Sequence, residues 1–280
     1  MIAPGRAEHA PPLLSTYASS IDVESLKGTV EGVRAIVAAH ARAIPFETLD
    51  PYLGRGVDLT PAVVADKLLL QRRGGWCFEQ NLLLGEVLRG LGVTVTDLAA
   101  RVLWFRPEGL RSPRTHRLLL VELEGRRYLA DVGFGILTLT GLLALEPDVV
   151  QPTPHEPHRL TRRGDDWVLE ARLGATWQPV YSFDLHPQWP EDFESVNYQL
   201  AHDPASPFVG QLRAARVTPE GRLSLRGTDL SLWGSGGLLW QRTLRDVPDL
   251  LEVLENRFGI AARPLPDVER GLARCFVPAP

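Results

Sequence analysis

Cys77 lies where a cysteine could act as a nucleophile. It follows two glycines and opens a helical pattern, within the run Arg-Arg-Gly-Gly-Trp-Cys-Phe-Glu-Gln-Asn over residues 72–81. At the start of a helix, unpaired backbone amides carry partial positive charge, and that charge stabilises a thiolate. The glycines let another backbone or a substrate approach without obstruction by side chains. Because most free cysteines are buried and inert, the hypothesis needs a partner base elsewhere in the chain.

His116 and Asp131 offer a base and a group to orient it, as a thiolate nucleophile requires. They lie at the far ends of a predicted hairpin, with strands at 117–123 and 127–132 around Glu124-Gly125. If those two residues form the loop, residue 123 pairs with 126 and residue 118 with 131. The two side chains are then diagonal neighbours on one face, about 5–8 Å apart at Cβ. A three-residue loop would place them on opposite faces.

These residues belong to three motifs that resemble the arylamine N-acetyltransferase family in order and spacing. The motifs are Arg73-Gly-Gly-Trp-Cys77-Phe-Glu-Gln-Asn81, Pro113-Arg-Thr-His116 and Leu129-Ala-Asp131-Val-Gly-Phe-Gly135. The likeness continues in residues 44–50, 100–102 and 204–212, so it covers nearly the full chain.

The resemblance implies an enzyme with a Cys77-His116-Asp131 triad, arranged as in cysteine proteases, and a reaction in two stages. Cys77 takes an acetyl group from acetyl-CoA, CoA leaves, and an arylamine or arylhydrazine accepts the acetyl group. His116 would pair with the thiolate and then serve as acid and base, while Asp131 fixes its orientation. Acetyl-CoA would be a co-substrate, and no cofactor would be bound permanently.

By position in the family motifs, four apolar residues would line the acceptor pocket, which suits a flat aromatic amine. They are Phe46, Trp76, Val102 and Phe134. An oxyanion site would use backbone amides at the start of the helix, including that of Cys77.

The sequence departs from the family pattern after Gly135, where Ile136 and the following residues replace a second glycine and a later proline. That stretch borders the donor channel in the family. An alternative is therefore an amide synthase of the same family, which condenses or macrocyclises a polyketide-type acyl chain delivered by a carrier protein. A cysteine hydrolase and a non-enzymatic binding protein are two further alternatives. The aromatic pocket argues against hydrolysis, and the complete triad argues against a binding protein.

The predicted secondary structure changes along the chain from helices to strands. Helices are predicted at 21–43, 61–70 and from Cys77 to about residue 90, with an irregular connection at 44–51. Strands are predicted at 93–105, 117–123, 127–132, 166–172, 211–217, 222–226 and 238–242, with a loop over 142–157 and a late helix at 247–258. This predicts an α+β fold with an N-terminal helical bundle (1–95), a central β-barrel (96–195) and a C-terminal α/β lid (196–280).

Composition limits the other classes of function. The 280 residues carry a formal net charge of −4, so nucleic acid is not an expected partner. With two cysteines and no long apolar run, the chain lacks the signature of a secreted disulfide scaffold or a membrane protein. We expect a cytoplasmic protein. His155 and His158 are separated by a proline and have no further ligands nearby, so no metal site is predicted.

Overall fold

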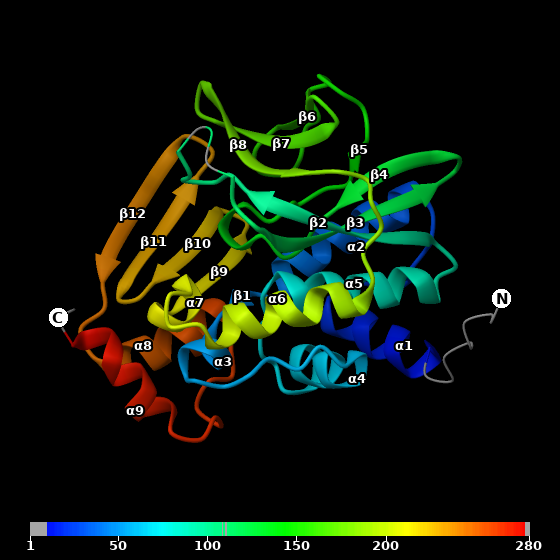
Figure 1. Cartoon of the computed structure of the whole chain (residues 1–280). Coiled ribbons are helices and arrows are strands. Elements are labelled where there is room, and N and C mark those ends of the chain that lie inside the picture. Colours follow the sequence, from blue (N-terminus) through cyan, green and yellow to red (C-terminus); the bar gives the residue numbers. More distant parts are fainter. Residues whose placement is uncertain (1–9, 108, 110, 278–280) are drawn as a thin grey trace.

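Helices make up most of the N-terminal third of the protein. The computed structural model describes residues 10–107, 109 and 111–277. Its first elements (Figure 1) are α1 (Ala10–Ser20), α2 (Val30–Ala43), β1 (Phe46–Glu47), α3 (Leu49–Tyr52), α4 (Pro61–Ala65), the π-helical turn η1 (Asp66–Leu70) and α5 (Cys77–Gly90).

The predicted helix over 21–43 is wrong in its first part. Residues 21–29 lie outside any helix, and α2 begins at Val30 because the Thr29 hydroxyl accepts a hydrogen bond from the Gly32 amide at 3.1 Å. Helix α1 was not predicted at all. The helix predicted from Cys77 is confirmed and ends at Gly90.

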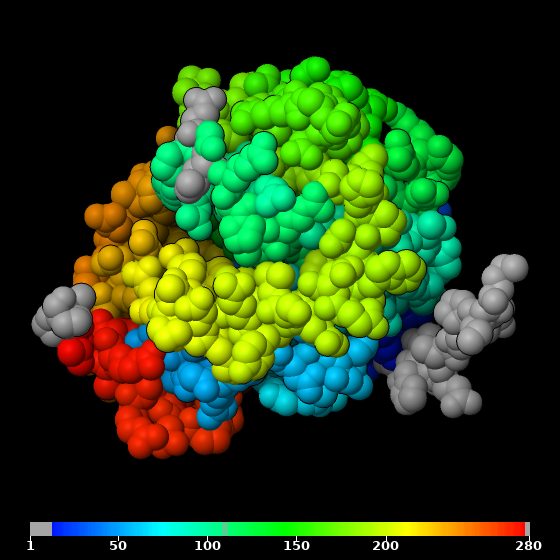
Figure 2. All heavy atoms as spheres, viewed as in Figure 1, coloured from blue at the N-terminus to red at the C-terminus, as the bar shows by residue number. Residues whose placement is uncertain are grey.

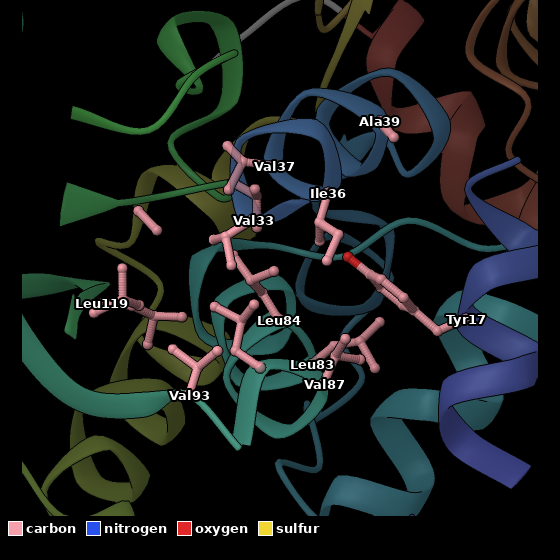
Figure 3. Packing of buried hydrophobic residues seen from close by; sticks show 14 of the residues in the cluster. Tyr17, Val33, Ile36, Val37, Ala39, Leu83, Leu84, Val87, Val93 and Leu119 are labelled. Atoms are coloured by element: carbon pink, nitrogen blue, oxygen red, sulfur yellow. The ribbon is translucent and has the colours of Figure 1, made fainter. Parts of the chain in front are cut away.

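Helix α5 is the centre of the helical part, and it is buried along most of its length. Figure 3 shows Leu83, Leu84 and Val87 of α5 among side chains of α1 and α2, with Leu119 of the neighbouring sheet on another side. A helix that is enclosed in this way is held by packing on all sides. Its first residue, Cys77, is therefore presented by a rigid element.

The middle of the chain forms a seven-stranded antiparallel sheet that curls into a nearly closed barrel. Its strands follow the order β5-β4-β3-β2-β8-β7-β6, and an isolated bridge between Pro147 and Leu160 brings its two edges together. The strands are β2 (Thr94–Val102), β3 (Arg114–Leu123), β4 (Arg126–Ala130), β5 (Leu143–Ala144), β6 (His158–Arg163), β7 (Asp166–Leu173) and β8 (Thr176–Phe183). The short turn η2 (Gly135–Leu137) follows β4.

The β3–β4 hairpin has the predicted register. Leu123 pairs with Arg126, and the pairing continues to Leu119 and Ala130. Glu124 and Gly125 have φ of 52° and 75°, as a two-residue type I′ turn requires. Because of this register, His116 and Asp131 lie on the same face of the hairpin. Asp131 is the residue directly after β4.

The C-terminal part is a five-stranded antiparallel sheet with helices around it. Its order is β1-β9-β10-β11-β12, so β1 joins a sheet whose other strands come from the far end of the chain (Figure 1). The elements are α6 (Pro190–His202), α7 (Pro207–Gly210), β9 (Arg213–Thr218), β10 (Gly221–Arg226), β11 (Asp229–Gly234), β12 (Gly237–Thr243), α8 (Val247–Val253), η3 (Leu254–Phe258), α9 (Val268–Leu272) and η4 (Ala273–Phe276).

The α+β architecture with its helical, barrel and α/β parts agrees with the prediction, whereas individual elements do not all agree. The loop predicted over 142–157 contains strand β5, and strands β6, β8 and β11 and helix α6 are further elements that were not predicted. The division at residues 95 and 195 stays a prediction, although β1 shows that the first and third parts share a sheet. Among the described residues, no helix has the length and apolar character needed to cross a membrane.

Candidate active site

The three predicted chemical side chains meet where the start of α5 approaches the β3–β4 hairpin. His116 Nε2 lies 2.7 Å from Asp131 Oδ2, and both side chains are almost fully buried. Cys77 Sγ lies 3.8 Å from the carbonyl oxygen of Thr115, the residue before His116. Because Asp131 occupies Nε2, the ring nitrogen left for the thiol is Nδ1.

The protonation of His116 is decided by a competition between burial and its two neighbours. Burial alone would lower its pKa, but the Asp131 carboxylate and then Cys77 outweigh burial and raise the pKa of His116 to about 10. The same interaction, with hydrogen bonds from Asn81 and Gly133, holds the pKa of Asp131 below its ordinary value despite complete burial. The site therefore favours an imidazolium between a carboxylate and a thiol.

Asn81 links the Asp131 carboxylate to helix α5, and the sequence alone did not predict that role. Its Nδ2 donates to Asp131 Oδ1 at 2.9 Å and to the Arg117 carbonyl at 2.6 Å, while its Oδ1 accepts from the Val132 amide at 3.0 Å. Asn81 lies four residues after Cys77, one helical turn further along the same face. That spacing was the signal available in the sequence.

Gly133 lets the segment after β4 lie directly against the start of α5. A Cβ at this position would lie 2.6 Å from Cys77 Cα and 2.9 Å from Asn81 Nδ2, both impossible distances without movement. The Gly133 amide also donates to Asp131 Oδ1 at 3.0 Å. The glycine is therefore required by close approach.

Aromatic rings enclose the imidazole of His116. Its ring centroid lies 5.0 Å from that of Phe134, edge to face, and 5.1 Å from that of Tyr181 on β8. The Tyr181 hydroxyl is buried without a hydrogen bond of ordinary geometry, and burial followed by the nearby Asp131 carboxylate raises its pKa. These rings exclude water around the His116–Asp131 pair, which strengthens their interaction.

The predicted pocket residues occupy different surroundings. Trp76 is 1% exposed, with its ring 5.6 Å from that of Phe208 on α7, and Phe46 is partly buried 6.4 Å from the same ring. Val102 ends β2, opposite Tyr181 of β8. Phe208 connects Trp76 with Phe46, yet the sequence offered only its place in a segment resembling the family.

A buried group of charges lies behind the start of α5. Arg73 pairs with Glu47 at 2.6 Å and Asp50 at 3.2 Å, and Lys67 pairs with Asp50 and Glu79 at 2.6 Å each. Glu79 Oε2 also accepts a hydrogen bond from the Trp76 amide at 3.1 Å. The ion pairs thus anchor the backbone next to Cys77.

Ile136 and the two histidines singled out in the sequence make other contacts. Ile136 is partly buried and packs against the barrel core. The His155 ring is 3.0 Å from the Thr218 carbonyl through Nε2, and His158 is buried 3.7 Å from Glu156. Residues 10–107, 109 and 111–277 contain no group of three or more His, Cys, Asp or Glu side chains suited to a metal ion.

Comparison with known proteins places this geometry in a family. Residues 29–265 match a family model described as N-acetyltransferase. The chain is 45% identical to the arylamine N-acetyltransferase of Mycobacterium bovis over 83% of each protein, and 41% identical to that of Escherichia coli over 89% of each.

Solved structures agree with the sequence comparison. The arylamine N-acetyltransferase of Mycobacterium marinum in complex with CoA superposes with a TM-score of 0.90 at 39% identity, covering 94% of this chain and 98% of that one. The enzyme of M. smegmatis gives a TM-score of 0.89 at 41% identity, covering 93% and 97%. The resemblance seen in the motifs is thereby confirmed, and the chain belongs to the arylamine N-acetyltransferase family of enzymes.

Proposed function

We propose that this protein transfers the acetyl group of acetyl-CoA to an arylamine or arylhydrazine through a thioester on Cys77. The observation that carries the proposal is the buried His116–Asp131 pair beside a cysteine at the start of a helix. The names of the relatives support the acceptor class, and the CoA complex of the M. marinum enzyme supports the donor.

In the first stage the Cys77 thiolate attacks the acetyl carbonyl carbon. The bond between that carbon and the CoA sulfur breaks, and the departing thiolate takes the proton of the His116 imidazolium. The start of α5 offers unpaired backbone amides, including that of Cys77, for the negative charge on the carbonyl oxygen. The products are acetyl-Cys77, neutral His116 and CoA.

In the second stage the acceptor nitrogen attacks the thioester carbon. His116 takes the proton that the nitrogen loses, and the bond to Cys77 Sγ breaks, so the imidazolium and thiolate return together. Asp131 keeps the ring in place and stabilises its charge in both stages. The aromatic ring of the acceptor would contact Phe46, Trp76, Val102 and Phe134, with Phe208 adjoining the first two.

The comparisons give no support to an amide synthase or to a carrier protein partner, and neither is carried further. The small-molecule partners of the proposal are acetyl-CoA and an aromatic amine. No permanently bound cofactor is needed, because the acetyl group resides on the protein between the two stages.

Acylation of the protein by acetyl-CoA alone tests the proposal directly. After incubation without an acceptor, peptide mass spectrometry should find one acetyl group on Cys77, and later addition of an arylamine should remove it. Cys275 is an internal control, because burial raises the pKa of its thiol and it has no histidine partner among the described contacts. Absence of the adduct, with Cys77 still open to alkylation, would contradict the proposal.

A further inference from the structure

Two arginines face each other on neighbouring strands of the C-terminal sheet. Arg213 of β9 and Arg226 of β10 are paired directly across the ladder. Among the described residues, neither guanidinium forms an ion pair with a carboxylate, and Arg226 Nε donates to the neutral Gln211 side chain at 2.7 Å. Like charges directly opposite one another destabilise a sheet unless something compensates them.

The strand register places both arginines on the active-site face of this sheet. Phe46 of β1 pairs with Ala215, and Ala215 pairs with Ser224 of β10. Arg213 and Arg226 are each two residues from those partners, so they share the face of Phe46. The opposite face, with Ala214 and Leu225, packs in the core with α8.

A short chain of contacts joins Arg213 to the nucleophile. Its guanidinium carbon lies 5.8 Å from the centre of the Phe208 ring, and that ring lies 5.6 Å from Trp76, the neighbour of Cys77. Figure 2 shows the surface recessed between the orange strands of this sheet, the yellow α6–α7 segment and the green-cyan segment before β3. The arginines thus lie beyond Phe208, on the same side as the site.

The charge around the pair is incompletely balanced by the protein. Arg213 is partly buried, and its Nε is fully enclosed without a hydrogen-bond partner. Burial and the neighbouring Arg226 both lower the pKa of Arg213. Asp229 is the cross-strand neighbour of Arg226, but its carboxylate accepts from Thr243 at 3.3 Å and makes no ion pair with Arg226. A dianionic ligand would supply the negative charge that the protein does not place beside Arg213 and Arg226.

We propose that Arg213 and Arg226 form a subsite for the phosphate groups of acyl-CoA. This inference rests on the proposed function, since it assumes that the acyl donor reaches Cys77 past Phe208. The pantetheine arm separates the reacting thioester from the phosphates, so a phosphate seat is expected at a distance from the thiol. Guanidinium groups suit phosphate because they donate several hydrogen bonds in one plane.

The test compares an acyl donor that has phosphates with one that lacks them. Arg213→Gln, Arg226→Gln and the double variant are assayed for Cys77 acylation by acetyl-CoA and by acetyl-pantetheine. We expect the ratio of kcat/KM for acetyl-CoA to kcat/KM for acetyl-pantetheine to fall about tenfold in each single variant, and further in the double variant. Arg162→Gln, on β6 and stacked on Trp167, is the matched control and should leave the ratio unchanged.

The outcomes separate this inference from the proposed function. If neither donor acylates Cys77 in the unaltered protein, the proposed function is wrong. If both donors acylate it and the ratio stays the same in the double variant, or falls equally in Arg162→Gln, the phosphate subsite is wrong while the proposed function stands. Acetyl-dephospho-CoA, if it behaves like acetyl-CoA in all variants, would place the contact at the diphosphate.

Discussion

At the scale of single residues, the site works by making burial and charge oppose each other. An isolated histidine at the position of His116 would be neutral, since its side chain is only 3% exposed. The Asp131 carboxylate reverses that preference. Asn81 and the Gly133 amide in turn stabilise this buried carboxylate, because both donate hydrogen bonds to it. The charge of the imidazolium therefore depends on one carboxyl group.

Asp131→Asn should remove the positive charge of His116, and with it the imidazolium that we propose as the partner of a Cys77 thiolate. Without the carboxylate, burial dominates and the pKa of His116 falls below neutral, so the ring no longer stabilises a thiolate at pH 6 to 7. We expect the rate of Cys77 alkylation by iodoacetamide at pH 6, relative to pH 9, to fall at least about tenfold. Asp184→Asn, which removes a carboxylate paired with Arg114 instead, should not change this ratio. An unchanged pH profile in Asp131→Asn would contradict the ion-pair description.

At the scale of elements, the start of α5 is held from two sides. The buried ion pairs of Arg73 and Lys67 hold it from behind, and the segment after β4 presses on it at Gly133. We do not expect Arg73, Lys67 or Gly133 to contact a substrate. Substitutions of these residues should therefore change the position of Cys77 or the stability of the fold.

Arg73→Met should destabilise the fold strongly, because it leaves the buried Glu47 carboxylate without its ion-pair partner, whereas Asp50 keeps its pair with Lys67. We expect a loss of about 3–5 kcal/mol in the free energy of unfolding, measured in urea at pH 7. The adjacent Arg72 is exposed and makes a matched control; Arg72→Met should change stability by less than about 0.5 kcal/mol. Equal stabilities of the two variants would show that the buried pairs contribute little.

Gly133→Ala should slow acylation more than it destabilises the fold. The added methyl group forces the segment after β4 away from Cys77, and a displacement of about 1 Å can cost about a hundredfold in rate. We expect that loss in the rate of Cys77 acylation by acetyl-CoA, with the protein still folded by circular dichroism. Gly236→Ala is the control, since a Cβ there meets nothing within 4 Å. An acylation rate within a factor of two of that of the unaltered protein would show that the segment after β4 can move away from Cys77 without displacing the thiol.

At the scale of the whole molecule, buried histidines connect parts of the chain that are far apart in sequence. The His40 ring, inside the helical part, is 2.8 Å from the Tyr17 hydroxyl and 3.0 Å from Gln80 of α5. His158 of the barrel lies beside Glu156, which pairs with Arg222 of the C-terminal sheet. Burial lowers the pKa of each histidine to about 4.

These two histidines should make the fold sensitive to acid. Below about pH 6.5 the unfolded chain binds a proton at each of them. The native protein does so only near pH 4, so the contribution of these two histidines to stability falls as the pH falls through this window. His116, whose pKa is raised to about 10, contributes in the opposite direction. His40 and His158 should each cost about 2 kcal/mol of unfolding free energy between pH 8 and pH 5. His158→Leu should reduce the loss by about 2 kcal/mol in urea titrations, whereas the exposed His186→Leu should not. An equal loss between pH 8 and pH 5 in His158→Leu and in the unaltered protein would contradict this.

Short-range patterns were enough to predict several parts of this protein. Cys77 opens α5 because glycines precede a helical run, and the β3–β4 register follows from a two-residue turn, so both depend only on residues close in sequence. The motifs around Cys77, His116 and Asp131 also indicated the family correctly. Helix α1 was missed because its pattern is weakly amphipathic, and its docking against α5 supplies the stabilisation that the pattern lacks.

The surroundings of Cys77, His116 and Asp131 depend on tertiary packing. Local sequence patterns predicted a cysteine at a helix start and a histidine near an aspartate. Packing between segments more than a hundred residues apart brought Phe208 to Trp76, and joined β1 to β9 so that Phe46 shares a face with Arg213. No local periodicity encodes such contacts, because they arise from how whole faces bury apolar surface against each other. Local pattern indicated the proposed nucleophile Cys77 and its proposed partner His116, and the packing of the helical part, barrel and C-terminal sheet formed the surroundings of both residues.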